Sequence, residues 1–216
     1  MLFRSAYDGS FPVPAPDAEA VRRILMLLQT GQATRVLIDG ALDYRIGIMA
    51  RVAQLAIENG RSILIIVGEV VRAQWVAEVL RNTTHRPVIC QLRGMSGVDM
   101  ALSGSATPQI VVGTRSAIFA SLRSIGLMWV DGEEDSALKE PQEPHYHVRE
   151  VAWMRAQQES ALVVYGSAHP SLEVRSVGDL EWFVQKRAAD SFPHVELVDM
   201  SRELGGFPFK IGRAHV

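Results

Sequence analysis

The chain has 216 residues, 48% of them hydrophobic, and a formal net charge of −2. This length fits one large domain or two small ones with a packed core. The near-neutral charge gives no sign of a nucleic-acid partner, so any basic surface must be local. The single cysteine, Cys90, excludes a disulfide framework and a cysteine zinc site within these residues, and its apolar neighbours predict a buried strand thiol. No apolar run reaches membrane-spanning length and the first residues lack a signal-peptide core, so we expect a cytoplasmic protein with no membrane partner.

Both ends of the chain have a composition that we treat separately from the fold. Residues 1–5 and 211–216 resemble translated sequencing-adapter sequence, so the predicted fold does not include them. We therefore expect native sequence from about residue 6 to residue 210, with ordinary frayed termini as the alternative. Residues 6–16 are rich in glycine and proline, which predicts a linker.

Helical and extended patterns alternate along the rest of the chain. Periodic apolar positions and stop signals predict helices over 18–29, 44–58, 70–81 and 146–159, with shorter helices after 113 and after 166. Apolar runs predict strands over 34–38, 62–67, 87–91, 109–112, 126–130 and 161–165, and mixed strand and turn over 177–200. This alternation predicts one α/β domain: a three-layer, doubly wound, mainly parallel sheet with right-handed crossovers.

An acidic cluster follows the apolar run 126–130. Four of the five residues after this run are acidic: Asp131, Glu133, Glu134 and Asp135. In parallel sheets the ligand crevice lies outside the carboxyl ends of the strands, which is where a magnesium nucleotide would bind. A solvated acidic turn is the alternative interpretation.

Three sequence blocks carry a family resemblance. Residues 110–119 match the pattern I-V-x-G-T-R-S-A-x-F, and residues 166–173 match G-S-A-T-P-x-L-E except for a histidine in place of threonine. Between them, residues 130–139 and 145–150 parallel D-E-E-H-D-S-S-Y-K and a following Y-H-x-R-D. In this order the blocks resemble the first motor lobe of the PriA family of replication-restart helicases, within superfamily 2, over about residues 33–200.

The resemblance carries expectations about fold and partners. It implies a RecA-like P-loop NTPase lobe over residues 17–200, with residues 201–210 beginning a connection to a second lobe. It also implies binding to forked or single-stranded DNA and to primosome and replisome proteins. In this family zinc is held by a cysteine-rich module, and no such module lies in this chain.

The nucleotide motifs depart from the family pattern. A phosphate loop of the form G-x-x-G-x-G-K-T lets backbone N–H groups and a lysine reach the phosphates. The corresponding residues 39–46 read Asp-Gly-Ala-Leu-Asp-Tyr-Arg-Ile, so Gly40 remains and Arg45 occupies the lysine position. Arginine does not replace lysine conservatively in a cradle this tight.

The acidic box and the third block have changed as well. Asp131 keeps the metal-orienting position, while Gly132 occupies the catalytic glutamate position and Glu133 is displaced by one. Ser167 is retained in the third block. This pattern is similar to the actinobacterial branch of the family. It leaves Asp131 and Glu133 as remnant catalytic candidates, with Gly40, Arg45 and Ser167 as remnant nucleotide-binding candidates. We expect no bound metal, and ATP with magnesium to be a doubtful ligand.

Two better preserved segments are candidates for DNA contact. Thr114, Arg115 and Ser116 follow a strand and open a helix, which suits a backbone phosphate. The alternative is a helix cap with Arg115 paired to a carboxylate such as Asp131. In the second segment Tyr146 would stack on a base while His145, His147 and Arg149 meet phosphates. Its alternatives are a capped helix start or a His-x-His metal site, which requires an extended backbone.

The sequence thus predicts a replication-restart segment that binds forked or single-stranded DNA and supports replisome reloading without hydrolysing ATP. One alternative is a segment of an active ATP-dependent 3′–5′ helicase with a divergent phosphate loop. The other is a non-catalytic α/β interaction scaffold.

The four tryptophans are predicted to be core or domain-interface residues.

Overall fold

The computed structural model describes residues 13–92 and 107–185. The adapter-like ends, most of the predicted linker, residues 186–200 and the predicted connection over 201–210 lie outside the described residues.

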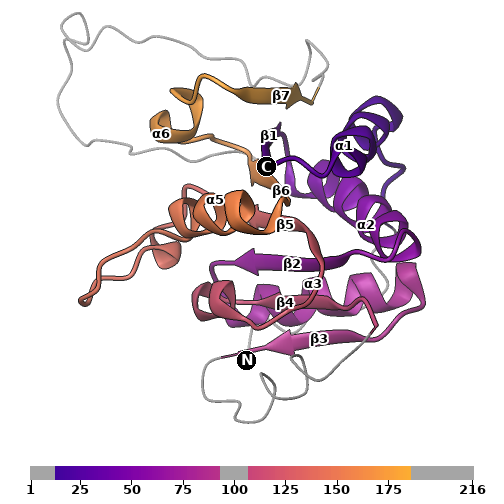
Figure 1. The fold of residues 1–216 in the computed structure, drawn as a ribbon, viewed down its shortest axis with the longest axis horizontal. Coiled ribbons are helices and arrows are strands. Elements are labelled where there is room, and N and C mark those ends of the chain that lie inside the picture. Colours follow the sequence, from indigo (N-terminus) through magenta and orange to yellow (C-terminus); the bar gives the residue numbers. More distant parts are fainter. Residues whose placement is uncertain (1–12, 93–106, 186–216) are drawn as a thin grey trace, which may run out of the picture. The chain divides into compact units, whose positions relative to one another are not determined.

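A seven-stranded sheet organises the described residues (Figure 1). Its strands are parallel throughout and run in the order β3-β4-β2-β5-β6-β1-β7. β5 occupies the middle position and is buried along its whole length, as its apolar sequence predicts. The strands span Thr34–Asp39 (β1), Ser62–Val67 (β2), Val88–Gln91 (β3), Ile110–Gly113 (β4), Ile125–Asp131 (β5), Leu162–Ser167 (β6) and Leu180–Val184 (β7).

Helices cover both faces of this sheet. One core contains buried residues of α1 (Ala18–Thr30), α2 (Leu42–Glu58) and α3 (Val70–Thr84). The other contains residues of the 3₁₀ helices η1 (Arg115–Phe119) and η2 (Ser136–Leu138) and of the helices α5 (Val148–Glu159) and α6 (Leu172–Arg175). Because strand side chains alternate between faces, Val36 and Ile38 enter the first core and Leu37 the second. The predicted three-layer α/β fold is confirmed, and it is consistent with a RecA-like lobe.

Caps explain several of the helix boundaries. Asp17 caps α1 by accepting from the backbone N–H groups of Glu19 and Ala20, and Gly31 ends the helix with φ of 62°. The last long helix begins at Val148, two residues later than predicted, because His147 Nδ1 accepts from the Arg149 N–H and makes His147 the N-cap.

Burial of the tryptophans and the cysteine follows strand position. Trp75 and Trp129 are buried as predicted, whereas Trp182 on the edge strand β7 is 41% exposed. Cys90 is only partly buried, contrary to the prediction, because β3 is an edge strand with a neighbour on one side. Partial burial still raises the pKa of its thiol, which disfavours the reactive thiolate.

None of the helices in the described ranges combines the length and the apolar character that crossing a bilayer requires.

Candidate functional site

The predicted nucleotide residues meet at one edge of the sheet. Because the strands are parallel, the segments that follow β1, β2, β5 and β6 all leave from their carboxyl ends. This edge holds Gly40 and Arg45 after β1, Asp131 at the end of β5, Glu133 just beyond it, and Ser167 at the end of β6.

Two arginines bind the carboxylate of Asp131. Arg45 Nε lies 2.7 Å from Asp131 Oδ1, and Arg45 Nη2 lies 3.2 Å from Oδ2. Arg72, from the first turn of α3, places Nη2 2.6 Å from the same Oδ2. Arg45 is 3% exposed and Asp131 is fully buried, so this pair is removed from water. We call Arg45, Arg72 and Asp131 the arginine–aspartate cluster. Each oxygen of the Asp131 carboxylate accepts from a guanidinium.

The surroundings of the cluster are closely packed. Arg45 Nη1 donates to the Gly40 carbonyl at 2.6 Å, and the Trp129 indole N–H lies 3.4 Å from Asp131 Oδ1. A Cβ added at Gly166 would stand 2.5 Å from Asp131 Oδ1 and 3.1 Å from Arg45 Cδ. Glycine at this position therefore leaves the room that the ion pair occupies.

The segment that would form a phosphate loop is a tight turn. β1 ends at Asp39 and α2 begins at Leu42, so only Gly40 and Ala41 connect them. The Gly40 N–H donates to the Ser167 carbonyl at 2.8 Å, and the Ala41 N–H donates to Gln185 Oε1 at 2.8 Å. Both backbone donors of the turn are thus used within the protein.

Glu133 forms a second buried cluster at this edge. It is fully buried, and its Oε1 accepts from the Ser171 N–H at 2.7 Å. Its Oε2 accepts from Ser171 Oγ at 2.8 Å and from Arg149 Nη1 at 2.7 Å. Glu133, Arg149 and Ser171 tie the acidic box to α5 and to the start of α6. We call them the glutamate cluster.

Gly132 and Ser167 have local structural roles beside these clusters. Gly132 adopts φ of +68°, a left-handed backbone conformation that side-chain-bearing residues rarely take. Ser167 is fully buried, and its Oγ accepts from the His169 N–H at 2.8 Å, which stabilises the turn after β6.

Arg115 anchors the segment that leads into the second DNA-contact candidate. Its guanidinium donates to the carbonyls of Ala137 and Lys139, at 3.2 and 2.8 Å, and pairs with Glu140 Oε2 at 2.8 Å. Its carboxylate partner is therefore Glu140 and not Asp131, which the alternative interpretation named. Nearby, Thr114 is partly buried and makes no side-chain cap bond, and Ser116 is exposed.

Residues 139–147 form an excursion that we call the 139–147 loop. Its base is closed by an antiparallel bridge between Lys139 and His147 and by the Glu140 N–H, which donates to the Tyr146 carbonyl at 2.8 Å. In Figure 1 this segment projects from the body of the fold between η2 and α5. A surface pocket of about 770 Å³ lies beside it, lined by Arg115, Ser136, Ala137, Lys139, Glu140, Pro141 and His145.

The four residues predicted in the loop segment separate in the structure. His145 is exposed, and Tyr146 is partly buried against Phe119 with a ring-centroid distance of 5.3 Å. His147 is the α5 N-cap, and its pKa is lowered by burial and then by the positive charge of Arg149. Arg149 is 8% exposed and faces Glu133. A phosphate contact by Arg149 would therefore require this buried pair to open.

Metal ligation finds no geometric support in the described ranges. There, no group of three or more histidine, cysteine, aspartate or glutamate side chains is placed to hold an ion. The acidic residues that looked like a cluster in the sequence diverge, since Asp131 faces arginines and Asp135 caps η2 by accepting from the Ala137 N–H.

Sequence reasoning missed three residues that the structure brings into these sites. Arg72 could have been identified from the sequence, because it lies in the first turn of a helix that follows a strand paired with β5. Ser171 was less visible, since its contact with Glu133 joins segments 38 residues apart. Phe119 ended a recognised block, but its contact with Tyr146 depends on tertiary packing.

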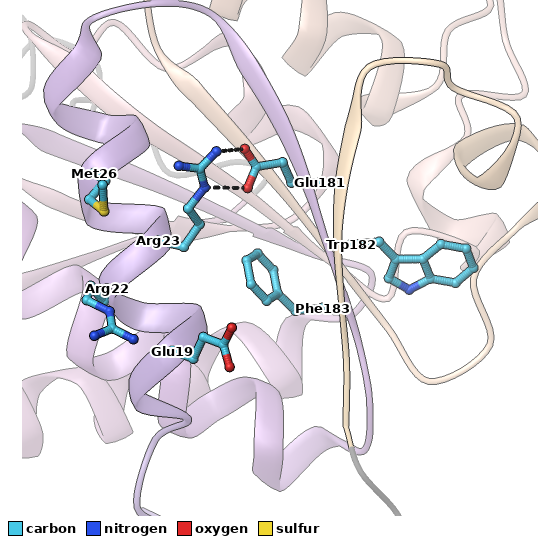
Figure 2. Close-up of a pocket in the computed structure, with 7 residues that line it drawn as sticks. All are labelled: Glu19, Arg22, Arg23, Met26, Glu181, Trp182 and Phe183. Atoms are coloured by element: carbon cyan, nitrogen blue, oxygen red, sulfur yellow. Dashed lines mark hydrogen bonds and ion pairs between the residues drawn. The ribbon is translucent and has the colours of Figure 1, made fainter.

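A second pocket lies between α1 and the edge strand β7 and contains none of the predicted site residues. It has a volume of about 420 Å³ and is shown in Figure 2. Arg23 and Glu181 form a bidentate ion pair at its rim, with distances of 2.8 and 2.6 Å, while the Phe183 ring lies below the pair. Trp182 points away from this pocket, on the other face of β7.

Comparison with known proteins gives a consistent set of relatives. No protein-family model matches the chain. The chain is 35% identical over 163 residues to the replication restart protein PriA of Synechocystis, which covers 68% of this chain and 19% of that protein. It is 30% identical over 180 residues to PriA of Treponema pallidum, covering 72% of this chain and 25% of that protein. It is 40% identical over 82 residues to the probable PriA of Mycobacterium tuberculosis, covering 38% of this chain and 12% of that protein.

These relatives are considerably longer than the chain, which spans between an eighth and a quarter of their length. The position of the acidic box at the end of β5 and the matched sequence agree with the resemblance drawn from the three blocks. The chain is PriA-like, since it is similar to part of the replication restart proteins.

Proposed function

We propose that this chain acts as a degenerate first motor lobe in a PriA-like replication restart protein of the cytoplasm. It contacts forked or single-stranded DNA, works with primosome and replisome proteins, and does not hydrolyse ATP. Zinc, where a PriA-like protein needs it, is supplied by cysteines outside these 216 residues, since the chain has only Cys90.

The arginine–aspartate cluster is the observation that carries the loss of ATP hydrolysis. A magnesium nucleotide needs a carboxylate that faces the metal shell and a cationic side chain that faces the phosphates. Arg45 and Asp131 instead neutralise each other in a fully buried pair, and Arg72 takes the second carboxylate oxygen. These residues do not fit a magnesium nucleotide, which supports the proposal.

The turn and the acidic box support the same conclusion. The N–H groups of Gly40 and Ala41 are used by Ser167 and Gln185, so they are not available to cradle a phosphate. Gly132 supplies no carboxylate at the catalytic position, and Glu133 is held by Ser171 and Arg149 in a direction fixed by three hydrogen bonds.

DNA contact is supported by exposed residues of the 139–147 loop and η1. Lys139 and His145 are exposed beside the pocket at the 139–147 loop, and Ser116 is exposed on η1. Cations next to an aromatic side chain are the usual combination for binding a single strand. The sequence identity to PriA proteins supports the same assignment.

A nucleotide titration tests the first part of the proposal. Thermal unfolding of the 216-residue chain is recorded with increasing ATP and magnesium, with magnesium alone as the control. A ligand at 100 times its Kd would add about 2.7 kcal/mol of stability, enough to raise Tm by several degrees in a domain of this size. We expect no shift. A saturable rise in Tm with ATP, together with phosphate release stimulated by single-stranded DNA, would favour the active helicase instead.

A salt titration tests the second part. Fluorescence anisotropy of a labelled single strand is measured at several salt concentrations, because phosphate contacts release counterions and weaken as salt rises. We expect weak binding whose logarithm falls linearly with the logarithm of salt. A chain that does not bind the strand at low salt would favour the non-catalytic scaffold.

A further inference from the structure

Phe119 is a large aromatic side chain that the fold holds out toward solvent. It is 58% exposed, although it ends a segment whose neighbours Ala117 and Ile118 are fully buried. A single exposed apolar side chain is common on protein surfaces, so it is the bracing of this ring and the groups beside it that distinguish Phe119.

The backbone around Phe119 is fixed on both sides. Arg155 of α5 donates through Nη1 to the carbonyls of Ile118 and Ala120, and its guanidinium is held in turn by Glu159 at 2.7 Å. The Ala120 N–H also bonds back to the Ala117 carbonyl at 2.9 Å. The exposed ring is therefore presented by a braced backbone, so little conformational entropy remains to be lost when it binds.

Tyr146 gives this ring an aromatic neighbour from another part of the chain. The two rings meet edge to face, with an interplanar angle of 79° and centroids 5.3 Å apart. Tyr146 packs on the second core, so it contacts the Phe119 ring on one side and leaves much of the Phe119 side chain open. We call Phe119 and Tyr146 the aromatic pair.

Positive charge lies beside the aromatic pair. Lys139 lies on the loop that carries Tyr146, and Arg115, whose charge is paired with Glu140, is on the same 3₁₀ helix as Phe119. In the part of the chain that the structure describes, Lys139 is exposed and makes no ion pair, so its ammonium group is available. An aromatic face next to an unpaired cation suits a nucleotide, whose base stacks while its phosphate meets the cation.

We propose that Phe119 is a base-stacking residue, which takes one unpaired base of a single strand on its exposed face while Lys139 contacts an adjoining phosphate. Tyr146 and Arg155 are positioning residues that hold Phe119 in place. This inference rests on the proposed DNA-binding function and deepens it, because it assigns the base contact to a residue outside the segment from His145 to Arg149. It also predicts little sequence preference, since every base has an aromatic face.

The test uses the 216-residue chain and a short single strand carrying 2-aminopurine. Phe119→Leu keeps an apolar side chain and removes the aromatic face, whereas Phe119→Trp keeps that face. Trp182→Leu is the matched control, because Trp182 is an exposed aromatic on β7, at the opposite edge of the sheet from η1 and β4. Urea unfolding checks that these three variants and Lys139→Ala fold, as expected for exposed side chains.

We expect Phe119→Leu to weaken binding about 5- to 150-fold and to abolish the quenching of 2-aminopurine, since one stacked base is lost. The slope of affinity against salt should stay unchanged, because the phosphate contacts remain. Lys139→Ala should instead lower that slope by about 1 while quenching persists in the bound state. Phe119→Trp and Trp182→Leu should bind like the wild type.

The outcomes separate this inference from the proposed function. If Phe119→Leu binds and quenches like the wild type while binding stays salt-dependent, base stacking at Phe119 is refuted and DNA binding stands. The same loss in Trp182→Leu as in Phe119→Leu would also refute it, because the effect would not be local. If the wild type does not bind the strand, both are refuted, and a protein partner becomes the explanation for the exposed ring.

Discussion

Arg45 Nε and Asp131 Oδ1 lie 2.7 Å apart in the interior, with the Arg45 side chain 4% exposed and that of Asp131 fully buried. The two residues occupy positions that, in the resemblance to PriA, would face a phosphate and a metal ion. Here they face each other. The pair explains why an arginine at the lysine position of a phosphate loop is compatible with a packed structure.

Breaking this pair should destabilise the chain. Arg45→Met leaves a buried carboxylate with Arg72 as its remaining partner, and we expect the free energy of unfolding to fall by about 3 kcal/mol. Urea unfolding followed by circular dichroism measures the change. Arg51→Met is the matched control, because Arg51 lies on the same helix and, among the described residues, its guanidinium bonds Gln54 at the surface. Equal stability of the two variants would contradict a structural role for the pair.

Restoring the glutamate at position 132 should not restore nucleotide binding. Gly132→Glu forces a side chain onto a backbone with φ of +68°, which costs about 1 to 2 kcal/mol. Gly178→Glu is the control, because a Cβ at Gly178 meets no atom within 4 Å and its φ lies outside the left-handed range. We expect lower stability only for the first variant, and no rise in Tm with ATP and magnesium for either. An ATP-dependent rise in Tm for Gly132→Glu would show that the arginine–aspartate cluster does not block nucleotide binding.

The glutamate cluster should show strong coupling in a double-mutant cycle. Glu133→Gln removes the negative charge and Arg149→Met removes the donor of a buried charged hydrogen bond of 2.7 Å. We expect a coupling free energy of about 1 to 3 kcal/mol from urea unfolding of the single and double variants. The reference cycle uses Arg23 and Glu181, an exposed pair of similar geometry at the rim of the pocket in Figure 2, for which about 1 kcal/mol or less is expected. Comparable values for the two cycles would contradict the importance of burial.

Stability should depend on pH through His147. Burial and the charge of Arg149 lower the pKa of this imidazole in the folded state, although Glu133, Glu150 and Glu173 act in the opposite direction. The unfolded state therefore binds the proton first as the pH falls below about 6.5, and the contribution of neutral His147 is lost toward the lower folded pKa. His147→Asn keeps a capping oxygen and removes the titration. Urea unfolding between pH 5 and 8 should show a smaller loss of stability for the variant, and identical pH profiles would refute the assignment.

The sequence predicted the sheet well because the information was local. Each buried strand is a short apolar run, as in Ser62–Val67, and each long helix has periodic apolar positions with a stop signal such as Gly31. The alternation of these patterns leaves few topologies, so a mainly parallel sheet could be inferred, whereas the middle position of β5 was not predicted. The start of α5 was missed by two residues, because the cap is a histidine rather than one of the usual capping residues.

The candidate site was predicted in its location but not in its bonding. The positions of Asp131 and Arg45 follow from the strand ends, yet nothing local indicates that they bind each other across 86 residues. Arg72 reaches the same carboxylate from a third element, and Arg149 turns inward although its segment is polar. Pairing of charges depends on tertiary distances of a few ångströms, which residue spacing does not encode.

The close fit at Gly166 has a consequence for how such a segment can change over time. Its missing Cβ leaves space for Asp131 Oδ1 and Arg45 Cδ, so a larger residue there would displace the pair that Arg72 completes. Substitution of Arg45 or Asp131 alone leaves a buried charge, and a larger residue at position 166 brings a steric clash, whereas Arg72 is a second, partly exposed partner. Among related sequences, positions 45, 131 and 166 should therefore covary and be kept or replaced together.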